Sequence, residues 1–391
     1  MVGKIGIIKI CELKSAMSEQ EILSTMALTK VRQLSQSNAR LLYEEIGSAE
    51  GVFAHRNDIR DVIPDATERL VNALADTDEA FRRAEAEMEF MRGKRVRCIT
   101  LNDSEYPLRL RECADAPLCL YYCGNADLNA AKVISVIGTR HCTEYGRDVC
   151  RNFIADLFRY HPDTLIVSGL AYGIDINAHR AALANGMATV GVLAHGLDTI
   201  YPSLHRHTAT QMVDNGGLLT EYMSHTIPEK GNFVRRNRIV AGMCDATIVV
   251  ESASKGGAII TAKLAQAYNR DVFAFPGRVY DEHSEGCNRM IKDNNAALIQ
   301  NAEDLVEAMC WSNPMKEKAE PLQQELFPGL SDEEELIVKA LTGVDDKQVN
   351  QIVVETGLSY SRVSSLMFEL EIKGVVAVLG GARYRIVKRG S

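Results

Sequence analysis

Residues 133–140 read Val-Ile-Ser-Val-Ile-Gly-Thr-Arg, a short and mostly β-branched run that ends at a glycine. Similar runs recur between residues 95 and 277, and amphipathic stretches such as 144–159 and 175–185 separate most of them. The other runs read VRCITL, LIVSGL, TVGVLA, ATIVVES and DVFAFPG. Continuous apolar strands that alternate with helices predict a parallel sheet covered by helices on both faces. Residues 94–311 are therefore predicted to form a Rossmann-like α/β domain.

A separate domain is predicted on each side of this sheet. Residues 1–93 show a helical spacing of apolar residues and are predicted to be a helical domain. Residues 312–331 are rich in Pro, Glu, Lys and Gln without periodicity, which predicts a linker. Residues 332–391 are predicted to be a winged helix. Its elements are helices at 333–341, 347–356 and 360–373, and a hairpin of 375–379 and 383–387 that turns at Gly380-Gly381.

Composition excludes several classes of protein. With 391 residues, 46% of them apolar and 25% charged, the chain resembles a soluble globular protein of two or three domains. No apolar run approaches the roughly 20 residues of a membrane span, and the first residues lack a secretory pattern, so a cytoplasmic location is expected. The ten cysteines form no Cys-x-x-Cys pair, which favours free thiols over zinc. His205 and His207 are expected to be solvent-exposed rather than metal ligands, and no cofactor is expected.

The net charge of −8 argues against a globally basic nucleic-acid binder. Between Arg95 and Asp304, however, 21 Lys and Arg nearly balance 23 Asp and Glu. Residues 230–238 concentrate a lysine and three arginines around Phe233. Arginine contacts phosphate in a bidentate way, and bases stack on aromatic rings. This segment predicts a local anion-binding patch, with a solvated helix start and a core Phe233 as the alternative.

The ends of the predicted strands carry glycines. In an open parallel sheet, ligands bind beyond the carboxyl ends of the strands, where helix N-termini offer backbone N–H groups to anions. Tight turns alone would be the alternative explanation of each glycine. The residues at these ends are Gly138-Thr139-Arg140, Ser168-Gly169, Gly196, Lys255-Gly256 and Pro276-Gly277.

Neither standard nucleotide motif is present. Arg140 stands where a dinucleotide-binding loop would need its second glycine, and the sequence contains no G-x-x-x-x-G-K-[ST] loop. Asp175 and Glu221 could form a catalytic acid–base pair. They are expected instead to anchor a helix start and to pair with basic residues.

These motifs together resemble the DNA-processing protein A (DprA, also called Smf) family of bacterial recombination mediators. The matching segments are Val136–Arg140 with Tyr145-Gly146, Val167–Asp175 with Ala178-His179, Gly196–Pro202, Gly216–Glu221, Arg236–Ile239, Gly257–Ala262, Phe275–Gly277 and Ser284–Asn288.

The resemblance implies an extended Rossmann fold and a non-catalytic role in natural transformation or recombination. It implies binding of single-stranded DNA without sequence preference, formation of a homodimer, and loading of the RecA recombinase. The implied DNA-binding residues are Gly138, Thr139, Arg140, Ser168, Gly169, Gly196, Lys230, Phe233, Arg235, Arg238, Lys255 and Gly256.

The two flanking domains depart from what DNA binding would need. The family's N-terminal domain, of SAM or helix-hairpin-helix type, often has a Gly-x-Gly turn, whereas residues 34–39 contain no glycine. The predicted recognition helix, residues 359–373, has no excess of basic residues. Both observations place DNA binding in the middle domain, and a partner-docking or packing role is favoured for the winged helix.

An enzyme on the same fold is the alternative interpretation. Phosphoribohydrolases that cleave nucleotide N-glycosides share this fold and use a Pro-Gly-Gly loop. Here Pro276-Gly277 continues with Arg278, and no P-G-G-x-G-T run is present. A binding protein is therefore preferred.

Overall fold

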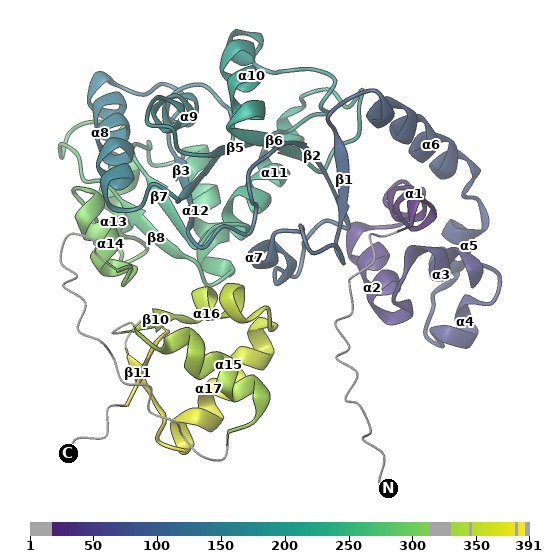
Figure 1. Ribbon diagram of the computed structural model, residues 1–391. Coiled ribbons are helices and arrows are strands. Elements are labelled where there is room, and N and C mark those ends of the chain that lie inside the picture. Colours follow the sequence, from purple (N-terminus) through teal and green to yellow (C-terminus); the bar gives the residue numbers. More distant parts are fainter. Residues whose placement is uncertain (1–17, 313–329, 344–345, 380–381, 388–391) are drawn as a thin grey trace, which may run out of the picture. The chain divides into compact units, whose positions relative to one another are not determined.

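The structure, a computed structural model, describes residues 18–312, 330–343, 346–379 and 382–387 (Figure 1). The chain divides into two compact units. One comprises Met1–Glu89 with Asn102–Ser104, and the other comprises Phe90–Leu101 with Glu105–Ser391. The turn at Gly380-Gly381 and most of the expected linker lie outside the described residues.

The first unit is helical, as predicted. Hydroxyl side chains start several of its helices. Ser35, for example, accepts the backbone N–H of Asn38 (3.1 Å) and starts its helix without a glycine turn. Buried Met26, Leu42 and Leu74 contribute to its core. The helices are α1 (Glu19–Leu28), α2 (Gln36–Ile46), α3 (Ala49–Ala54), α4 (Ile59–Val62), α5 (Glu68–Ala75) and α6 (Asp78–Arg92).

A nine-stranded sheet forms the centre of the second unit, in the order β1-β2-β6-β5-β4-β3-β7-β8-β9. From β6 to β9 all pairings are parallel, which confirms the predicted α/β class. The strands are β1 (Arg97–Thr100), β2 (Cys119–Gly124), β3 (Val133–Ile137), β4 (Leu165–Ser168), β5 (Thr189–Val192), β6 (Gly216–Thr220), β7 (Ala246–Val249), β8 (Asp271–Ala274) and β9 (Ala297–Leu298).

One prediction about the sheet was wrong. The run VRCITL was assigned to the parallel series, but β1 pairs antiparallel with β2, and β2 pairs antiparallel with β6. The strand β2 itself was not predicted. The two strands extend the parallel sheet at the edge formed by β6, and Tyr121 and Tyr122 of β2 are buried there.

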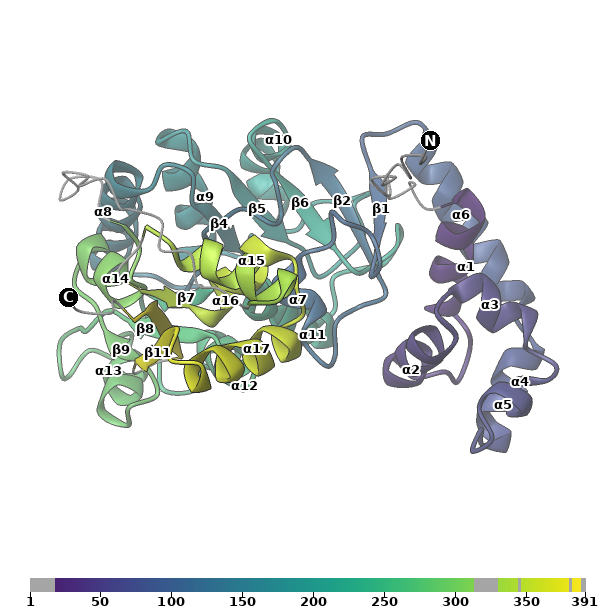
Figure 2. The same cartoon turned by 60° about the horizontal axis from the view of Figure 1, so that its bottom comes forward.

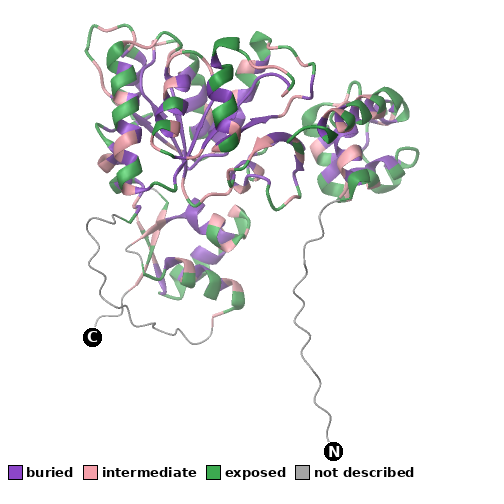
Figure 3. Cartoon of the chain, turned by 45° about the horizontal axis from the view of Figure 1, so that its top comes forward, coloured by how far each residue is buried: buried purple, intermediate pink, exposed green. Residues whose placement is uncertain are grey.

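Helices cover both faces of the sheet (Figures 1 and 2). The helices α8, α9 and α14 share one apolar core with β3, β4 and β7, and α11 packs against α12 on the opposite face. The strands from β3 to β8 are almost entirely buried between these layers, whereas both residues of β9 are exposed (Figure 3). The helices are α7 (Leu108–Arg111), α8 (Glu144–Tyr160), α9 (Ile174–Ala184), α10 (Arg206–Asp214), α11 (Lys230–Gly242), α12 (Gly257–Ala267), α13 (Glu285–Lys292) and α14 (Ala302–Ala308).

The strand order reverses at β3, which lies between β4 and β7. Connections from β3 run one way through β4 to β6, and from β7 the other way to β9. Loops on the two sides of such a reversal separate and leave a crevice at the carboxyl ends of the strands. The loops after β3 and β7 therefore flank the place where this fold binds ligands.

The C-terminal part of the described chain is a winged helix, as predicted. Its apolar core includes Ile337, Ile352 and Leu366, one from each helix. A short strand, β10, was not predicted and joins the hairpin in the order β10-β12-β11. The elements are α15 (Asp332–Leu341), β10 (Lys347–Gln348), α16 (Val349–Thr356), α17 (Tyr360–Ile372), β11 (Val376–Leu379) and β12 (Arg383–Ile386).

Candidate nucleic-acid interface

Glu251, the second residue after the end of β7, fixes the loop after β3. Its backbone carbonyl accepts the N–H of Thr139 (2.7 Å). Its buried carboxylate accepts the backbone N–H (2.9 Å) and hydroxyl (2.5 Å) of Thr143, the N-cap of α8. A Cβ on Gly146 would lie 2.1 Å from this carboxylate, so the first turn of α8 must carry glycine there. Glu251 thus holds the segment that carries Arg140.

Three segments that are far apart in the sequence meet at the ring of Phe233 on α11. The guanidinium of Arg140 lies 5.1 Å from the ring centroid, and that of Arg236 lies 5.9 Å from it. The ring of Tyr201 lies 5.8 Å away at an interplanar angle of 62°. Arg140 and Tyr201 are exposed and Phe233 is partly exposed. This cluster combines accessible aromatic surface with a cation, the two features that single-stranded nucleic acid requires.

Arg236 and Asp175 are buried beneath this cluster. One nitrogen of Arg236 donates to the carbonyls of Gly169 (2.6 Å) and Val192. The carboxylate of Asp175 accepts the backbone N–H groups of Gly169 (3.1 Å) and Ala171 (3.4 Å), which confirms the expected anchoring role. Burial lowers the pKa of Arg236 to about 10 and raises the pKa of Asp175, in spite of the opposing attraction between the two charges.

Arg236 and Asp175 leave no room for a side chain at position 169, which is a glycine. A Cβ at this position would lie 2.5 Å from the guanidinium of Arg236 and 2.6 Å from the carboxylate of Asp175. The glycine after β4 therefore lets the two charged groups approach the same stretch of backbone.

Arg238 does not face solvent, contrary to its expected role as a DNA contact. It is 7% exposed and forms an ion pair with Glu221, whose side chain is 4% exposed. The expected pairing of Glu221 with a basic residue is thus confirmed. Its consequence is that Arg238 is used inside the protein, where its charge offsets a buried carboxylate.

Most of the backbone amides expected to bind phosphate also donate within the protein. The N–H of Gly196 donates to the carbonyl of Thr226 (3.2 Å), and that of Gly256 to Ala253 (3.0 Å). The amides of Thr139 and Gly169 are engaged as described above, and the hydroxyl of Ser168 donates to the carbonyl of Val136 (2.7 Å). These residues shape the loops, since a donor already used inside is not free for an anion. A Cβ on Gly138 would lie 2.4 Å from Ile174, so this glycine also serves close packing.

Four of the expected cations do remain exposed: Arg140, Lys230, Arg235 and Lys255. Within the part of the chain that the structure describes, none of them pairs with a carboxylate. Lys230 and Arg235 lie on α11 with Phe233, and Lys255 lies in the loop after β7. Their charge is therefore available to a ligand.

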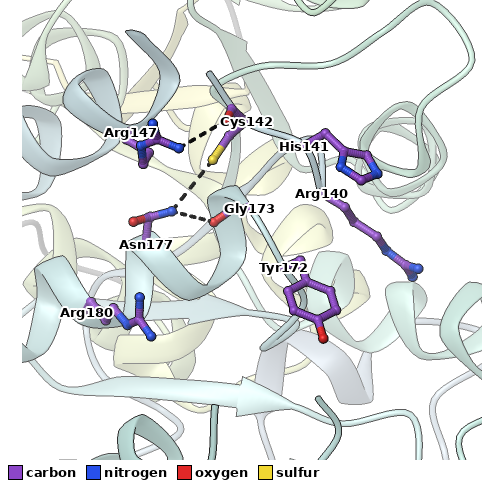
Figure 4. Close-up of a pocket in the computed structure, with 8 residues that line it drawn as sticks. All are labelled: Arg140, His141, Cys142, Arg147, Tyr172, Gly173, Asn177 and Arg180. Carbon is purple, nitrogen blue, oxygen red and sulfur yellow. Dashed lines mark hydrogen bonds between the residues drawn. The ribbon is translucent and has the colours of Figure 1, made fainter. Parts of the chain in front are cut away.

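The structure adds residues that the sequence did not identify. Tyr201 belongs to the Phe233 cluster, and Tyr172 is 43% exposed beside Arg140. A pocket of about 600 Å³ opens next to Arg140 and is also lined by Arg147, Tyr172 and Arg180 (Figure 4). The helical spacing of Asn177 and Arg180 could have indicated a common face, but only the fold brings that face to Arg140.

His205 is buried, so the expectation that it is solvent-exposed was wrong. It is 4% exposed, and its Nδ1 lies 2.9 Å from the carbonyl oxygen of Leu170, whereas His207 is exposed as expected. Burial lowers the pKa of His205, so it packs as a neutral ring against Tyr172. Among the residues described, no group of three His, Cys, Asp or Glu side chains could hold a metal ion.

Other features of the chain bear on the class of protein. The nine cysteines within the described ranges are all free. No described helix has both the length and the apolar character needed to cross a membrane.

In the winged helix, Arg362 of α17 pairs with Glu333 (2.5 Å), and Lys373, its C-cap, pairs with Glu334 (2.6 Å). The carboxylates thus neutralise the cations that a duplex-reading helix would need.

Comparisons with known proteins agree with this architecture. The family model of DNA recombination-mediator protein A matches residues 97–310, and that of the DprA winged helix domain matches residues 317–382. The chain is 35% identical over 322 residues to the putative DNA processing protein DprA of Mycobacterium tuberculosis, which covers 79% of this chain and 82% of that protein. It is 39% identical over 204 residues to the DNA processing protein DprA of Streptococcus pneumoniae, covering 52% and 71%.

A solved structure extends the likeness from sequence to shape. The X-ray structure of DprA from Streptococcus pneumoniae superposes with a TM-score of 0.63 at 32% identity, covering 73% of this chain and 97% of that chain. Both the mostly parallel sheet and the winged helix are thus accounted for by one family. From its fold, its sequence and the two matching domains, this chain belongs to the DprA/Smf family of DNA recombination mediators.

Proposed function

We propose that the middle domain binds single-stranded DNA without sequence preference, at the surface around Phe233. The observation that carries this proposal is the convergence of Arg140 and Tyr201 on the Phe233 ring. Every base has an aromatic face, so stacking on such rings tolerates any sequence. A duplex, by contrast, keeps its bases stacked on one another and offers none to these rings.

The phosphates are bound by side chains. Arg140, Lys230, Arg235 and Lys255 supply exposed positive charge along the carboxyl ends of the strands. Gly138, Thr139, Ser168, Gly169, Gly196 and Gly256 give the loops their shape, and Arg238 positions α11 through Glu221. Binding that rests on such contacts weakens steeply as salt is added. The protein displaces counterions from the DNA when it binds, and a higher salt concentration makes that release less favourable.

Phe233→Ala and Arg140→Ala test this placement. Loss of one stacked base costs about 1–3 kcal/mol, so Phe233→Ala should weaken binding roughly five- to hundredfold. Fluorescence anisotropy with a labelled oligothymidylate measures the dissociation constant, and a duplex of equal length is the comparison. Arg159→Ala, on the distant end of α8, removes a charge without touching the site. Unchanged affinity in both site variants would refute the placement.

The same proposal extends to the cellular role. A protein that holds single strands without sequence preference keeps them available to a recombinase, and we propose that this chain acts in the cytosol as a homodimer that helps to load RecA. Sedimentation of the full chain tests the dimer. A strand-exchange assay with RecA, in which the protein and its Phe233→Ala variant are compared, tests the loading. A monomer at micromolar concentration, or loading that is insensitive to Phe233→Ala, would contradict this extension.

The phosphoribohydrolase alternative is disfavoured. The matching family is described as a recombination mediator, and Pro276-Gly277 is followed by Arg278 instead of a second glycine. Release of free base from nucleoside monophosphates, measured with this protein, would reopen the alternative.

A further inference from the structure

The pocket beside Arg140 lies between the N-terminal parts of α8 and α9 (Figure 4), and Phe233 is not among its lining residues. Its volume of about 600 Å³ is within the range of about 300–1,000 Å³ that is common for small-ligand sites. Arg140 lines this pocket and also lies over Phe233, so it links the two places.

The pocket is strongly basic. Its lining includes Arg140, Arg147 and Arg180, and none of its lining residues, all of which the structure describes, is acidic. Arg147 shares its charge with Glu144 (3.1 Å) and also donates to the carbonyl of Cys142 (3.4 Å). Arg180 donates weakly to the hydroxyl of Thr208 (3.4 Å), and among the described carboxylates neither Arg140 nor Arg180 has a partner. A concave surface with unpaired guanidinium groups attracts an anion, and arginine suits phosphate in particular.

Tyr172 gives the pocket a rigid aromatic wall. Its ring is 43% exposed and packs edge-on against His205, with 5.1 Å between centroids and an angle of 71°. His205 is itself fixed by its contact with the carbonyl of Leu170 (2.9 Å). On the other side, the Asn177 amide donates to the carbonyl of Gly173 (2.7 Å), which fixes the turn that leads into α9. The wall is therefore preorganised, and a base that stacks on Tyr172 orders little in the protein.

We propose that this pocket binds a second nucleotide of the same DNA strand, next to the nucleotide that stacks on Phe233. Its phosphate lies between Arg140 and Arg180, and its base stacks on Tyr172. Arg147 adds positive charge at the rim. The inference rests on the proposed function, because it requires a strand that already contacts Arg140. It extends the binding path from α11 across the loop after β3 to α9.

Oligothymidylates of increasing length test this path. For the unchanged protein, affinity should rise when the strand becomes long enough to reach both aromatic rings. Tyr172→Ala should remove that step and weaken binding of long strands roughly five- to hundredfold, with less effect on the shortest strands. Arg180→Ala should lower the slope of log affinity against log salt by about 0.7, the value of one phosphate contact in a single strand.

Matched controls separate this charge from charge in general. Arg147→Ala and Arg159→Ala both remove an arginine that pairs with a carboxylate one turn before it on α8, but only Arg147 lines the pocket. We expect Arg159→Ala to keep the affinity of the unchanged protein and Arg147→Ala to lower it. Thermal unfolding of each variant establishes that it is folded. A strand that carries 5-iodouracil should also crosslink to Tyr172 on irradiation.

The outcomes distinguish this inference from the proposed function. If Phe233→Ala weakens binding while Tyr172→Ala and Arg180→Ala match the Arg159→Ala control, the second subsite is overturned and the first remains. If Phe233→Ala and Arg140→Ala have no effect, the proposed function fails at its own site. If the pocket variants reduce the affinity for deoxythymidine monophosphate but not for long strands, the pocket is a free-nucleotide site, and the proposed path is again overturned.

Discussion

The buried charges of Asp175 and Arg236 are predicted to be coupled energetically, although they form no direct ion pair. Atoms of both side chains lie within 2.6 Å of the point where a Cβ of Gly169 would stand, so the two charged groups are at most about 5 Å apart. At an effective dielectric constant of about 20, unit charges at that separation attract by about 3 kcal/mol. Asp175→Asn keeps the size of the side chain and removes the charge, so it leaves Arg236 buried without this partner.

The magnitude follows from these contacts. Asp175→Asn loses this attraction of about 3 kcal/mol and also the desolvation cost of the buried carboxylate, so it should lower the free energy of unfolding of the middle domain by less than about 3 kcal/mol. Arg236→Met removes the same attraction and also the hydrogen bonds to the carbonyls of Gly169 and Val192, each worth about 1–3 kcal/mol when a buried partner is left unpaired. In the double variant the lost attraction is counted only once. Its destabilisation should therefore be smaller than the sum of the two single effects by about 2–3 kcal/mol.

Trp311 makes the measurement specific to the right domain. It is the only tryptophan of the chain and lies in the core shared by α8, α9 and α14. Its fluorescence during urea unfolding therefore follows the middle domain, whereas a signal from the whole chain would mix several transitions. If the destabilisation of the double variant equals the sum of the two single destabilisations to within about 0.5 kcal/mol, the charges are not coupled and the prediction is refuted.

Two further predictions concern pH and the loop after β3. Burial lowers the pKa of His179 to about 3, so between about pH 3 and 6.5 the unfolded chain binds a proton that the folded chain does not. The contribution of His179 to the free energy of unfolding is therefore full above pH 6.5 and falls by about 1.4 kcal/mol for each pH unit towards pH 3. His179→Gln should remove about one proton from the pH dependence of unfolding between pH 4 and 6, and an unchanged slope would contradict this. Glu251→Ala should loosen Thr143, the N-cap of α8, and lower both the melting temperature and the affinity for oligothymidylate, because Arg140 lies in the loop that Glu251 holds in place. Affinity equal to that of the unchanged protein, after correction for the unfolded fraction, would show that the loop does not need this support.

The sequence alone was enough to predict the helices and strands that show a clear local pattern of apolar residues. The strand at residues 133–137 was predicted with its observed bounds, because a strand buried on both faces is a continuous apolar run. The three helices and the hairpin of the winged helix were predicted within a few residues, because each helix has its own periodic apolar face and the hairpin is marked in the sequence by Gly380-Gly381. Family motifs also indicated the loops at the carboxyl ends of the strands.

The tertiary structure decided which polar groups in those loops are accessible. Arg235 and Arg238 are near neighbours with the same side chain, yet the first is exposed and the second is buried against Glu221. Spacing within one helix could not tell which arginine would meet Glu221, a carboxylate supplied by the segment just after β6. The same holds for Tyr201, which meets Phe233, and for Arg180, which lines a pocket with Arg140. These residues come together only because the sheet order brings their separate segments to one side of the domain. Secondary structure follows from local patterns of burial, whereas the partners of a charge are set by contacts between residues that are distant in the chain.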